Sequence, residues 1–472
     1  MPRELLPLFG PNQEARLPRV NAQRSVNLYP SIEKPGAKGQ VVLYPTPGLT
    51  LTSQPASGVC RSDGVLFADN LYFVVGSSLV KVNSSGVGTS VGTLSTSGGR
   101  CVMAAGRSYL MIVDGANGYS WDGTTFASIS DGDFPANPTH CEYLDGYFIA
   151  NDSDSDNYQI SSTEDPTAWA ALDAGTAEGS PDDILALARL AKNLYLIGQS
   201  TTEIHFNSGN PDFPFEPYAN GNIDVGIRAP YSLKRTPYGL IWLAANDEGG
   251  DAVVVRCSGF QIEPISDDDL NWQINQLETT DDAFGSIYRR GGRTFYVLTF
   301  PSDQKTWVYD FTTNIWHERK SFGIDRWRSA GIGAIGRLTV VGDYENTNIY
   351  TMSDSVYTEN GETIERIRVT QVVHTNYHEI TFHELVLDAK MGVGLTSGQG
   401  SDPQVMLRYS DDGGNTWSSE LWQSLGKLGE YSHRAVWENL GASRERIFEF
   451  KVTDPVDFSA INAYAFIDVA SR

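Results

Sequence analysis

Several short stretches of this sequence contain residue types at spacings that could support chemistry. Three carboxylates alternate in Asp152-Ser-Asp-Ser-Asp156, as they do at the start of a calcium-binding loop. The sixth position would be Asn157, which tolerates positive φ, but the twelfth is Thr163 and the acid follows one residue later at Glu164. The stretch also follows an expected strand, whereas the helical calcium motif places its loop after a helix. Calcium binding stays open here, beside the preferred interpretation of a solvated acidic hairpin tip.

Histidines and glutamates gather further along the chain. His374 and His378 would share one face of an extended strand, with His383, Glu379 and Glu384 close by. This spacing could bring two imidazoles near a metal ion. The neighbouring residues favour strand, however, so the helical H-E-x-x-H geometry of zinc enzymes is absent. We therefore expect ordinary strand and turn positions and predict no metal ligands.

A glycine motif and two acidic runs also have a plain structural interpretation. Gly331-Ile-Gly-Ala-Ile-Gly336 satisfies G-x-G-x-x-G, yet it precedes a strand rather than the helix that a dinucleotide requires, which predicts a repeat turn and no cofactor. The runs Asp182-Asp183 and Asp267-Asp-Asp269 could supply paired carboxylates for glycoside hydrolysis. Such runs are expected in any chain this acidic, and neither a nucleophile elbow nor an H-E-x-x-H sequence accompanies them. We predict no catalytic residues and no enzyme activity.

Ser410-Asp-Asp-Gly-Gly-Asn-Thr-Trp417 matches the Asp-box pattern S-x-D-x-G-x-T-W at every position. This pattern predicts a hairpin in which Asp412 accepts turn amides, Gly414 adopts positive φ and Trp417 packs beneath. Sialidases contain such boxes, and so do many proteins without catalytic activity. We interpret this box as structural.

The elements that would position these residues repeat along the chain. Each repeat contains an apolar-aromatic strand between turns, and the repeats start roughly 38 to 54 residues apart, close to the blade period of kelch and WD-type propellers. A small antiparallel sheet cannot bury both faces alone, so tandem copies pack radially. The sequence predicts an all-β fold with a β-propeller of six or seven blades. The predicted core strands are Leu71–Val75, Tyr109–Val113, Tyr147–Ala150, Leu194–Ile197, Leu240–Leu243, Thr294–Leu298 and Leu338–Val341.

Cysteines support the repeat but not a disulfide scaffold, because four cysteines are too few for a chain of this length. Cys60, Cys101 and Cys141 are spaced by about forty residues and each precedes a core strand. We expect equivalent buried positions on successive blades, on the strand nearest the axis. A shared metal is the weaker alternative, since no C-x-x-C spacing is present.

Different patterns flank the repeats. Residues 1–50 contain six prolines before the Tyr44-Pro-Thr-Pro-Gly48 turn and predict an extended N-terminal arm, in which Arg24–Tyr29 could pair as one strand that closes the ring or docks on a neighbour. The propeller is assigned to residues 51–365. Longer strands predict a C-terminal β-sandwich over residues 366–472. Residues 181–190 are assigned to strand, with one turn of helix as the alternative.

Charge and hydropathy exclude several classes. A net charge of −23 argues against tight binding of nucleic acid, whose affinity comes from Lys and Arg. It suits a surface past which DNA slides without adhering. No apolar run is long enough to span a bilayer, and the first residues show no signal-peptide pattern, so we expect a chain made in a cytoplasm that does not contact membrane.

With the repeats, arm and last domain placed, the chain resembles the packaged-DNA stabilisation protein, or tail hub, of short-tailed double-stranded DNA phages. The similarity rests on local features along nearly the whole chain and not on one diagnostic motif. They are Val26-Asn-Leu-Tyr-Pro30, Leu43-Tyr-Pro-Thr-Pro-Gly-Leu49, Gly198–Phe206 with Ser208-Gly209, and Arg408-Tyr-Ser-Asp-Asp-Gly413.

This resemblance implies a structural virion protein in the tail, assembled in the host cytoplasm. Several copies, six in similar phages, would form a ring below the portal and its adaptor ring. The ring would extend the DNA channel, carry tailspikes or fibres on its flank, and hold a needle or plug at its tip, while genomic DNA passes without specific binding. The resemblance implies no cofactor and no catalytic residues.

Two other functions stay open. A glycan-binding or glycan-hydrolysing propeller for host recognition would show exposed Trp and Tyr around a polar mouth. A bacterial surface adhesin is a third hypothesis, which the lack of a visible export signal disfavours.

Overall fold

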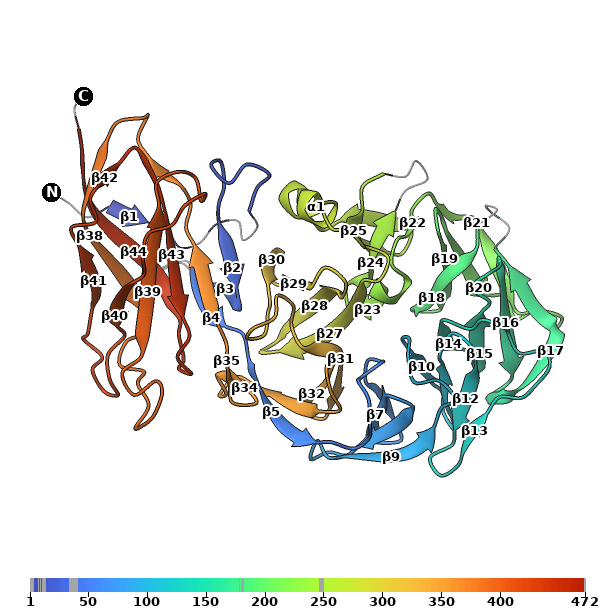
Figure 1. Ribbon diagram of the computed structural model, residues 1–472. Coiled ribbons are helices and arrows are strands. Elements are labelled where there is room, and N and C mark those ends of the chain that lie inside the picture. The colour runs from blue at the N-terminus through green and yellow to red at the C-terminus, as the bar shows by residue number, and fades with distance from the viewer. Residues whose placement is uncertain are drawn as a thin grey trace.

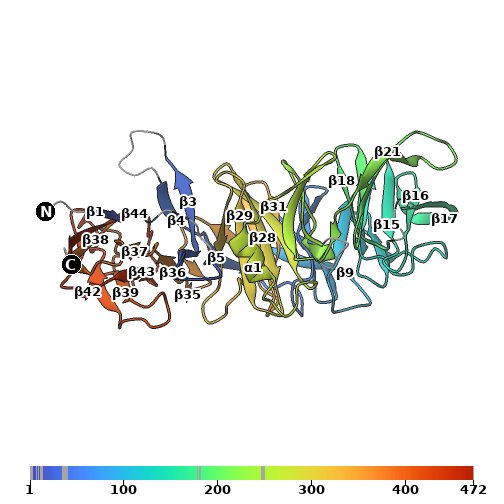
Figure 2. The same ribbon diagram turned by 90° about the horizontal axis from the view of Figure 1, so that it is seen from above.

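The computed structural model describes residues 4–6, 8, 10, 14–33, 41–177, 179, 182–245 and 250–470. Its described residues are nearly all strand and loop, with one α-helix, α1 (Asp268–Ile274), and one 3-10 helix, η1 (Pro230–Ser232). The molecule is elongated: a ring of small sheets occupies one end and a two-sheet domain the other (Figures 1 and 2). The all-β prediction is confirmed.

Six sheets of the ring are built from consecutive strands. The first two sheets contain β6 (Val65–Phe67), β7 (Asn70–Val75), β8 (Ser78–Val82) and β9 (Gly88–Thr93), and then β10 (Val102–Ala105), β11 (Leu110–Val113), β12 (Gly118–Trp121) and β13 (Phe126–Ser128). The third and fourth contain β14 (Cys141–Leu144), β15 (Tyr147–Asn151), β16 (Asn157–Ser162) and β17 (Asp165–Thr176), and then β18 (Ile184–Leu190), β19 (Asn193–Gly198), β20 (Thr202–Asn207) and β21 (Phe215–Ile223). The fifth and sixth contain β22 (Gly226–Ile227), β23 (Lys234–Thr236), β24 (Gly239–Ala245), β25 (Val253–Ser258) and β26 (Gln261–Pro264), and then β27 (Phe284–Arg290), β28 (Arg293–Phe300), β29 (Lys305–Asp310) and β30 (Ile315–Glu318). We number them blades 1 to 6.

A seventh blade closes the ring and is composite. It joins β31 (Ser329–Ile335), β32 (Leu338–Asp343) and β33 (Ile349–Ser353) to β5 (Gly48–Ser53), which comes from the N-terminal part of the chain. The short strands β34 (Thr358–Glu359) and β35 (Glu362–Thr363) extend this sheet beyond β5. The possibility that Arg24–Tyr29 closes the ring is wrong, because β5 completes the last blade and residues 24–29 pair elsewhere in the same chain.

The predicted core strands are confirmed, and each forms the second strand of a blade. The expected phase of the cysteines is also confirmed. Cys141 begins the inner strand β14, Cys101 directly precedes β10, and Cys60 bridges to Val75 beside β6; all three are buried. The strand interpretation of residues 181–190 holds from Ile184 onward, while Pro181 lies outside the described residues.

The C-terminal domain is a sandwich, as predicted. One sheet orders β3 (Leu28–Ile32), β4 (Val41–Pro45), β44 (Ala460–Val469), β38 (Ile380–Ala389) and β41 (Ala435–Glu438), with β1 (Glu4–Leu6) beside β44 and β42 (Ala442–Ser443) beside β38. The facing strands are β36 (Arg366–Val369), β43 (Glu445–Val452), β39 (Gln404–Ser410) and β40 (Leu421–Ser424), with β37 (Val373–His374) beside β43. Leucines, phenylalanines and alanines of both sheets fill the core between them.

One strand joins the two domains. β2 (Arg24–Val26) pairs antiparallel with β36 of the sandwich and makes a parallel bridge, Val26 to Glu318, with β30 of blade 6. A single ten-stranded sheet therefore runs from β27 in the propeller to β40 in the sandwich. The described parts of residues 1–50 thus lie along their own chain as strands of both domains, and the boundaries at 50/51 and 365/366 stay predictions.

Candidate functional site

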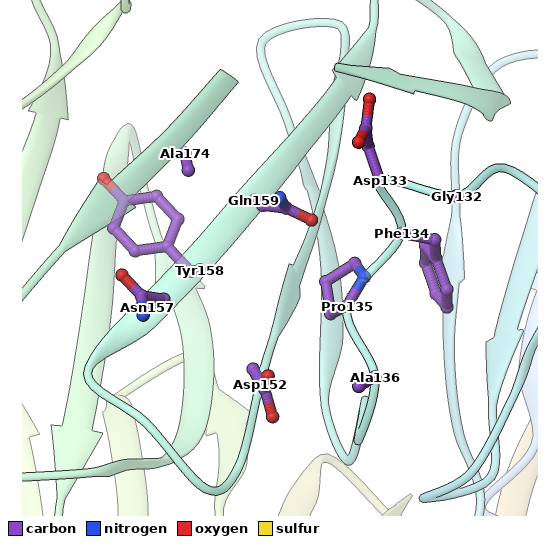
Figure 3. Close-up of a pocket in the computed structure, with 10 residues that line it drawn as sticks. All are labelled: Gly132, Asp133, Phe134, Pro135, Ala136, Asp152, Asn157, Tyr158, Gln159 and Ala174. Atoms are coloured by element: carbon purple, nitrogen blue, oxygen red, sulfur yellow. The ribbon is translucent and has the colours of Figure 1, made fainter. Parts of the chain in front are cut away.

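The acidic stretch after β15 forms a turn beside a pocket of about 310 Å³ (Figure 3). The Asp152 carboxylate accepts a long hydrogen bond from the Asp154 amide, 3.5 Å, and Asp154 accepts one from the side chain of Asn137, 2.9 Å. Across the described residues, no group of three His, Cys, Asp or Glu side chains converges as a metal site would require. The geometry favours the acidic hairpin tip over the calcium loop.

Tyr158 lines this pocket, but its hydroxyl is directed into the protein. It bonds to Nδ1 of His205 at 3.0 Å, and Nε2 of His205 lies 2.9 Å from the Glu203 carboxylate. Burial alone would raise the pKa of Glu203, yet hydrogen bonds from His205 and the Gly179 amide lower it. Burial strongly raises the pKa of Tyr158, which therefore stays protonated. These hydrogen bonds connect blades 3 and 4. Because the Tyr158 hydroxyl is protonated and directed inward, it does not give the pocket a nucleophile.

The histidine cluster does not assemble, and the expectation that His374 and His378 share one strand face is wrong. β37 ends at His374, and a tight turn follows, in which the His378 amide donates to the Thr375 carbonyl at 2.8 Å. His383 instead pairs with Asp468 at 2.9 Å on the neighbouring strand. These are strand and turn positions, as the absence of a helical motif predicted.

The glycine motif is an inner strand with a turn only at its end, so its description as a repeat turn was wrong. Gly331 and Gly333 lie within β31, where the last blade meets the first. A Cβ on Gly331 would lie 1.9 Å from the Ser62 carbonyl oxygen, and one on Gly333 would lie 2.7 Å from the Gly64 Cα. The glycines allow two backbones to approach at the seam of the ring.

Carboxylates of the two acidic runs accept hydrogen bonds from main-chain amides. Asp182 accepts hydrogen bonds from three successive amides, Gln199, Ser200 and Thr201. Asp267 accepts from the Leu270 amide and caps α1, a helix that we did not predict. Acids at the first turn and inward-facing Leu270 and Ile274, four residues apart, were the pattern that could have predicted it.

The Asp-box folds as predicted between β39 and β40. Asp412 accepts from the Thr416 amide at 2.8 Å and from its hydroxyl at 2.6 Å, and these bonds lower the pKa of Asp412 to about 2. Gly414 has φ +93° and the half-buried Trp417 lies beneath. Asp411 beside it forms a two-pronged pair with the buried Arg446, at 2.6 and 2.8 Å. The contacts of Asp412 hold the hairpin itself, and the pair between Asp411 and Arg446 attaches it to β43.

An ion pair connects opposite sides of the propeller, and the sequence did not reveal it. Asp63 of blade 1 lies 3.0 Å from Nζ of Lys234 on β23, almost opposite in the ring. It also accepts from Ser286 on β27 at 2.5 Å and from the Ile332 amide on β31 at 3.0 Å. Burial acts to raise the pKa of Asp63, but Lys234, Arg100 and these hydrogen bonds lower it below its usual value. One carboxylate thus ties four blades together.

Further contacts between non-neighbouring blades surround Asp63. His140 stacks on Tyr231 with ring centroids 5.3 Å apart, and burial together with Lys234 lowers the pKa of His140 to about 3. Arg100 donates to the Ala330 carbonyl at 2.8 Å and lies 4.0 Å over the Phe284 ring. The axis of the propeller is therefore occupied by the protein's own side chains.

The junction between the domains centres on Asn27, at the break between β2 and β3. Asn27 adopts φ +55°, and its amide side chain donates to the carbonyls of Lys320 and Glu365 at 2.9 and 2.8 Å. Its Oδ1 accepts from the Lys320 amide at 3.2 Å, and its backbone carbonyl accepts from Thr46. One residue therefore connects β3, the end of blade 6 and the start of the sandwich.

Arginines reinforce the junction on both sides of β2. Arg24 forms two hydrogen bonds with Glu318, at 2.5 and 2.6 Å, and this carboxylate raises the pKa of Arg24 further. The buried Arg368 donates to Ser25 at 3.0 Å and to Gln23 at 2.7 Å, while burial lowers its pKa to about 9. Because Arg368 is almost fully buried, losing its hydrogen-bond partners costs far more than losing a surface contact.

The two faces of the propeller differ in charge. Turns between second and third strands and the connections between blades lie on one face, which we call the acidic face. Arg228 is an exposed cation there. The exposed acids of this face are Asp133, Asp154, Asp183, Asp224, Asp251, Asp267, Asp268, Glu278, Asp281, Asp325 and Glu345.

On the opposite face the exposed charges balance. Its cations are Arg107, Lys192, Arg235, Arg289 and Arg337, and its acids are Asp69, Asp122, Asp145, Asp212 and Asp354. Much of the protein's net negative charge is therefore concentrated on one side. Among the described residues, no helix is long and apolar enough to cross a membrane.

Comparison with known protein families gives a clear match. Residues 8–357 match the family described as bacteriophage P22 Gp10, beta-propeller, and residues 365–468 match bacteriophage P22 Gp10, beta-sandwich. None of the curated protein sequences matches this chain.

Solved structures resemble the chain more distantly. The Swd1 β-propeller domain of Myceliophthora thermophila is 12% identical, with 65% of this chain and 99% of that chain covered and a TM-score of 0.43. The Pan2 WD40 domain of Neurospora crassa is 8% identical, with coverage of 62% and 89% and a TM-score of 0.40. An extracellular domain of a putative one-component system from B. thetaiotaomicron is 12% identical, with coverage of 80% and 47% and a TM-score of 0.45. These likenesses support no argument about function.

Proposed function

Because this chain belongs to the family of bacteriophage P22 Gp10, the packaged-DNA stabilisation protein, we propose that it forms the hub of a short phage tail. Members of this family are structural tail proteins of phages. In the proposed role, copies of the chain form a ring below the portal and adaptor, extend the DNA channel, and carry tailspikes or fibres and a terminal needle or plug. The ring assembles in the host cytoplasm and acts without catalysis.

The match of both domains, in order and over nearly the whole chain, is the observation that carries this proposal. The propeller axis supports it indirectly. Since Asp63, Lys234 and their neighbours fill each axis, DNA would pass between copies around a common channel and not through any one propeller. A ring of heterologous contacts provides such a channel and gives each copy two different faces.

The acidic face supports a channel that does not hold DNA. Affinity for the phosphate backbone comes from Lys and Arg, so a face with many carboxylates repels it. Stabilisation of the packaged genome would then result from mechanical closure of the channel. We expect the purified chain to leave duplex DNA unretarded in a gel at low salt, where electrostatic binding is strongest.

A glycan-binding propeller is the second candidate, and exposed aromatic side chains are the observation that would favour it. Tyr218 and Phe260 make an edge-to-face pair at 5.3 Å, and Tyr238 stacks on Phe311 at 4.8 Å. The first pair connects blades 4 and 5, and the second connects blades 5 and 6. The axis, where a propeller lectin would need a polar mouth, is occupied by the Asp63–Lys234 ion pair and the stack of His140 on Tyr231, which disfavours this function.

Electron microscopy of the full-length chain mixed with the portal and adaptor proteins of its own genome would test the proposal. We expect a symmetric ring collinear with the portal, and a higher melting temperature in the presence of the connecting partner, since a partner that binds the native state stabilises it. A monomer indifferent to both partners but stabilised by a panel of sugars would overturn the hub and favour the glycan function.

A further inference from the structure

We propose that the N-terminal strand β1 is exchanged between copies, so that residues 4–8 of one copy complete the sandwich of its neighbour. This inference rests on the proposed ring and names the segment that joins its members. The occupant of the strand's position is a second copy of this chain.

The first observation is what β1 contributes. Leu6 and Leu8 are 4% and 1% exposed and belong to the sandwich core, while Leu5 between them is 56% exposed. The strand thus inserts two leucines into a core otherwise made by residues far along the chain. Without them, the core next to Ala463 and Ala465 would be incomplete.

The second observation is how lightly β1 is attached. Among the described strands it pairs with β44 alone, over three residues, with Leu5 opposite Tyr464, and so forms an edge of its sheet. β44 is already paired on its other side with β38, where Val386 is opposite the same Tyr464. β1 can therefore leave and return without disturbing any other strand pair of the sandwich.

The third observation is the length of the chain between β1 and β2. About 15 residues separate Leu8 from Arg24, where β2 begins, and an extended chain of this length spans up to roughly 50 Å. Along this segment Leu17 and Val20 are 58% and 73% exposed, and Arg19 makes a surface ion pair with Glu445. Surface pairs of this kind contribute little stability, so they do not fix the strand to its own domain.

Exchange suits a closed ring for two physical reasons. The strand and the edge that receives it are different surfaces, as a heterologous interface requires. The exchanged contacts are the same as those within one copy. Exchange is therefore opposed by the entropy of the connecting segment and by its few contacts with its own chain, such as the hydrogen bond from Gln273 to the Glu14 carbonyl at 2.7 Å. Neighbours held in a ring present a high effective concentration of the strand, which offsets the entropic cost of exchange.

Disulfide trapping in assembled particles would test the inference. Two differently tagged full-length chains, one with Leu5→Cys and one with Tyr464→Cys, are produced together with the other virion proteins. We expect a disulfide between the two tags after mild oxidation. The four native cysteines are buried, and burial raises the pKa of Cys60 to about 12, so the engineered thiols react first.

The matched control places Val386→Cys and Tyr464→Cys on separate chains, because this pair lies wholly within one sandwich and should never link two copies. A ring without the Leu5–Tyr464 link between chains would overturn exchange and leave the hub intact, provided that both changes on one chain give a disulfide within it. Particles without a ring would overturn the hub, and exchange with it.

A second measurement uses the purified chain. The full-length Leu6→Asp/Leu8→Asp variant should release its own β1 and bind a synthetic peptide of residues 1–13 with a rise in melting temperature, whereas wild-type chain should not. The same peptide with Leu6→Asp should fail to bind, and a peptide with Leu5→Asp should still bind. If the variant folds and the unmodified peptide does not bind, exchange is overturned.

Discussion

Asp63 has partners on three other blades, and we expect its charge to stabilise the ring. Asp63→Asn retains an acceptor for Ser286 and Ile332 but leaves Lys234 without its ion pair. Lys234 is partly exposed, so the free energy of unfolding should fall by about 2–3 kcal/mol, less than for a fully buried pair. Urea titration would measure this, with the exposed Asp69→Asn as the control.

The pH dependence of this difference has a definite sign. Because the folded pKa of Asp63 is lower than its usual value, its stabilising effect is fully present above about pH 4 and is lost as the pH falls through the folded pKa. The difference in the free energy of unfolding between wild type and Asp63→Asn should be constant from neutral pH to about pH 5 and should become smaller in acid. A gap that widened in acid would contradict this assignment.

At the residue scale the sequence predicts what local chemistry decides. The Asp-box was predicted in detail because Asp412, Gly414 and Thr416 interact within one hairpin. Asp63 was not singled out, because its partners come from blades 5, 6 and 7 and are more than 150 residues away. A carboxylate in an acidic chain has no local feature that distinguishes such a role.

Among the elements, the break between β2 and β3 depends on one asparagine. Asn27→Gly preserves positive φ but removes the side-chain hydrogen bonds to Lys320 and Glu365, which should cost about 2–3 kcal/mol. Asn27→Ala should cost roughly 1 kcal/mol more, because alanine disfavours this backbone conformation.

Thermal unfolding of the two variants would check this order. Asn439→Gly is a matched control, since Asn439 also has positive φ, +57°, but is exposed in a turn. Equal losses of stability for Asn27→Gly and Asn27→Ala would show that the positive φ at this position does not contribute to the difference between the two variants.

The elements themselves were largely predictable, and their partners were not. Apolar runs such as Leu71–Val75 and Leu194–Ile197 are buried second strands, and their composition reveals this without tertiary information. By contrast, Gly48–Ser53 has no local feature that assigns it to blade 7, because its partner β33 begins at Ile349. The same reason explains why Arg24–Tyr29 was expected to be one strand and is two, on different sheets.

For the whole molecule, the sheet that runs through β2 predicts coupled unfolding of the propeller and sandwich. Scanning calorimetry of the wild-type chain should show one transition. In Arg24→Ala/Asn27→Ala, which removes the Glu318 pair and the central hydrogen bonds, we expect two transitions. Arg19→Ala, which breaks only a surface ion pair, should leave one. Two transitions in the wild type would show that the domains are independent.

The composite seventh blade has a consequence for synthesis of the chain on the ribosome. β5 emerges early, yet its partner β33 follows nearly 300 residues later, which takes roughly 15–60 seconds at ordinary translation rates. During that time six blades can form while the ring stays open, and the waiting strand presents an unpaired edge to every other nascent chain. A strongly acidic chain keeps such intermediates apart by mutual repulsion. The net negative charge would then prevent incomplete chains from associating during synthesis, in addition to its role in the folded protein.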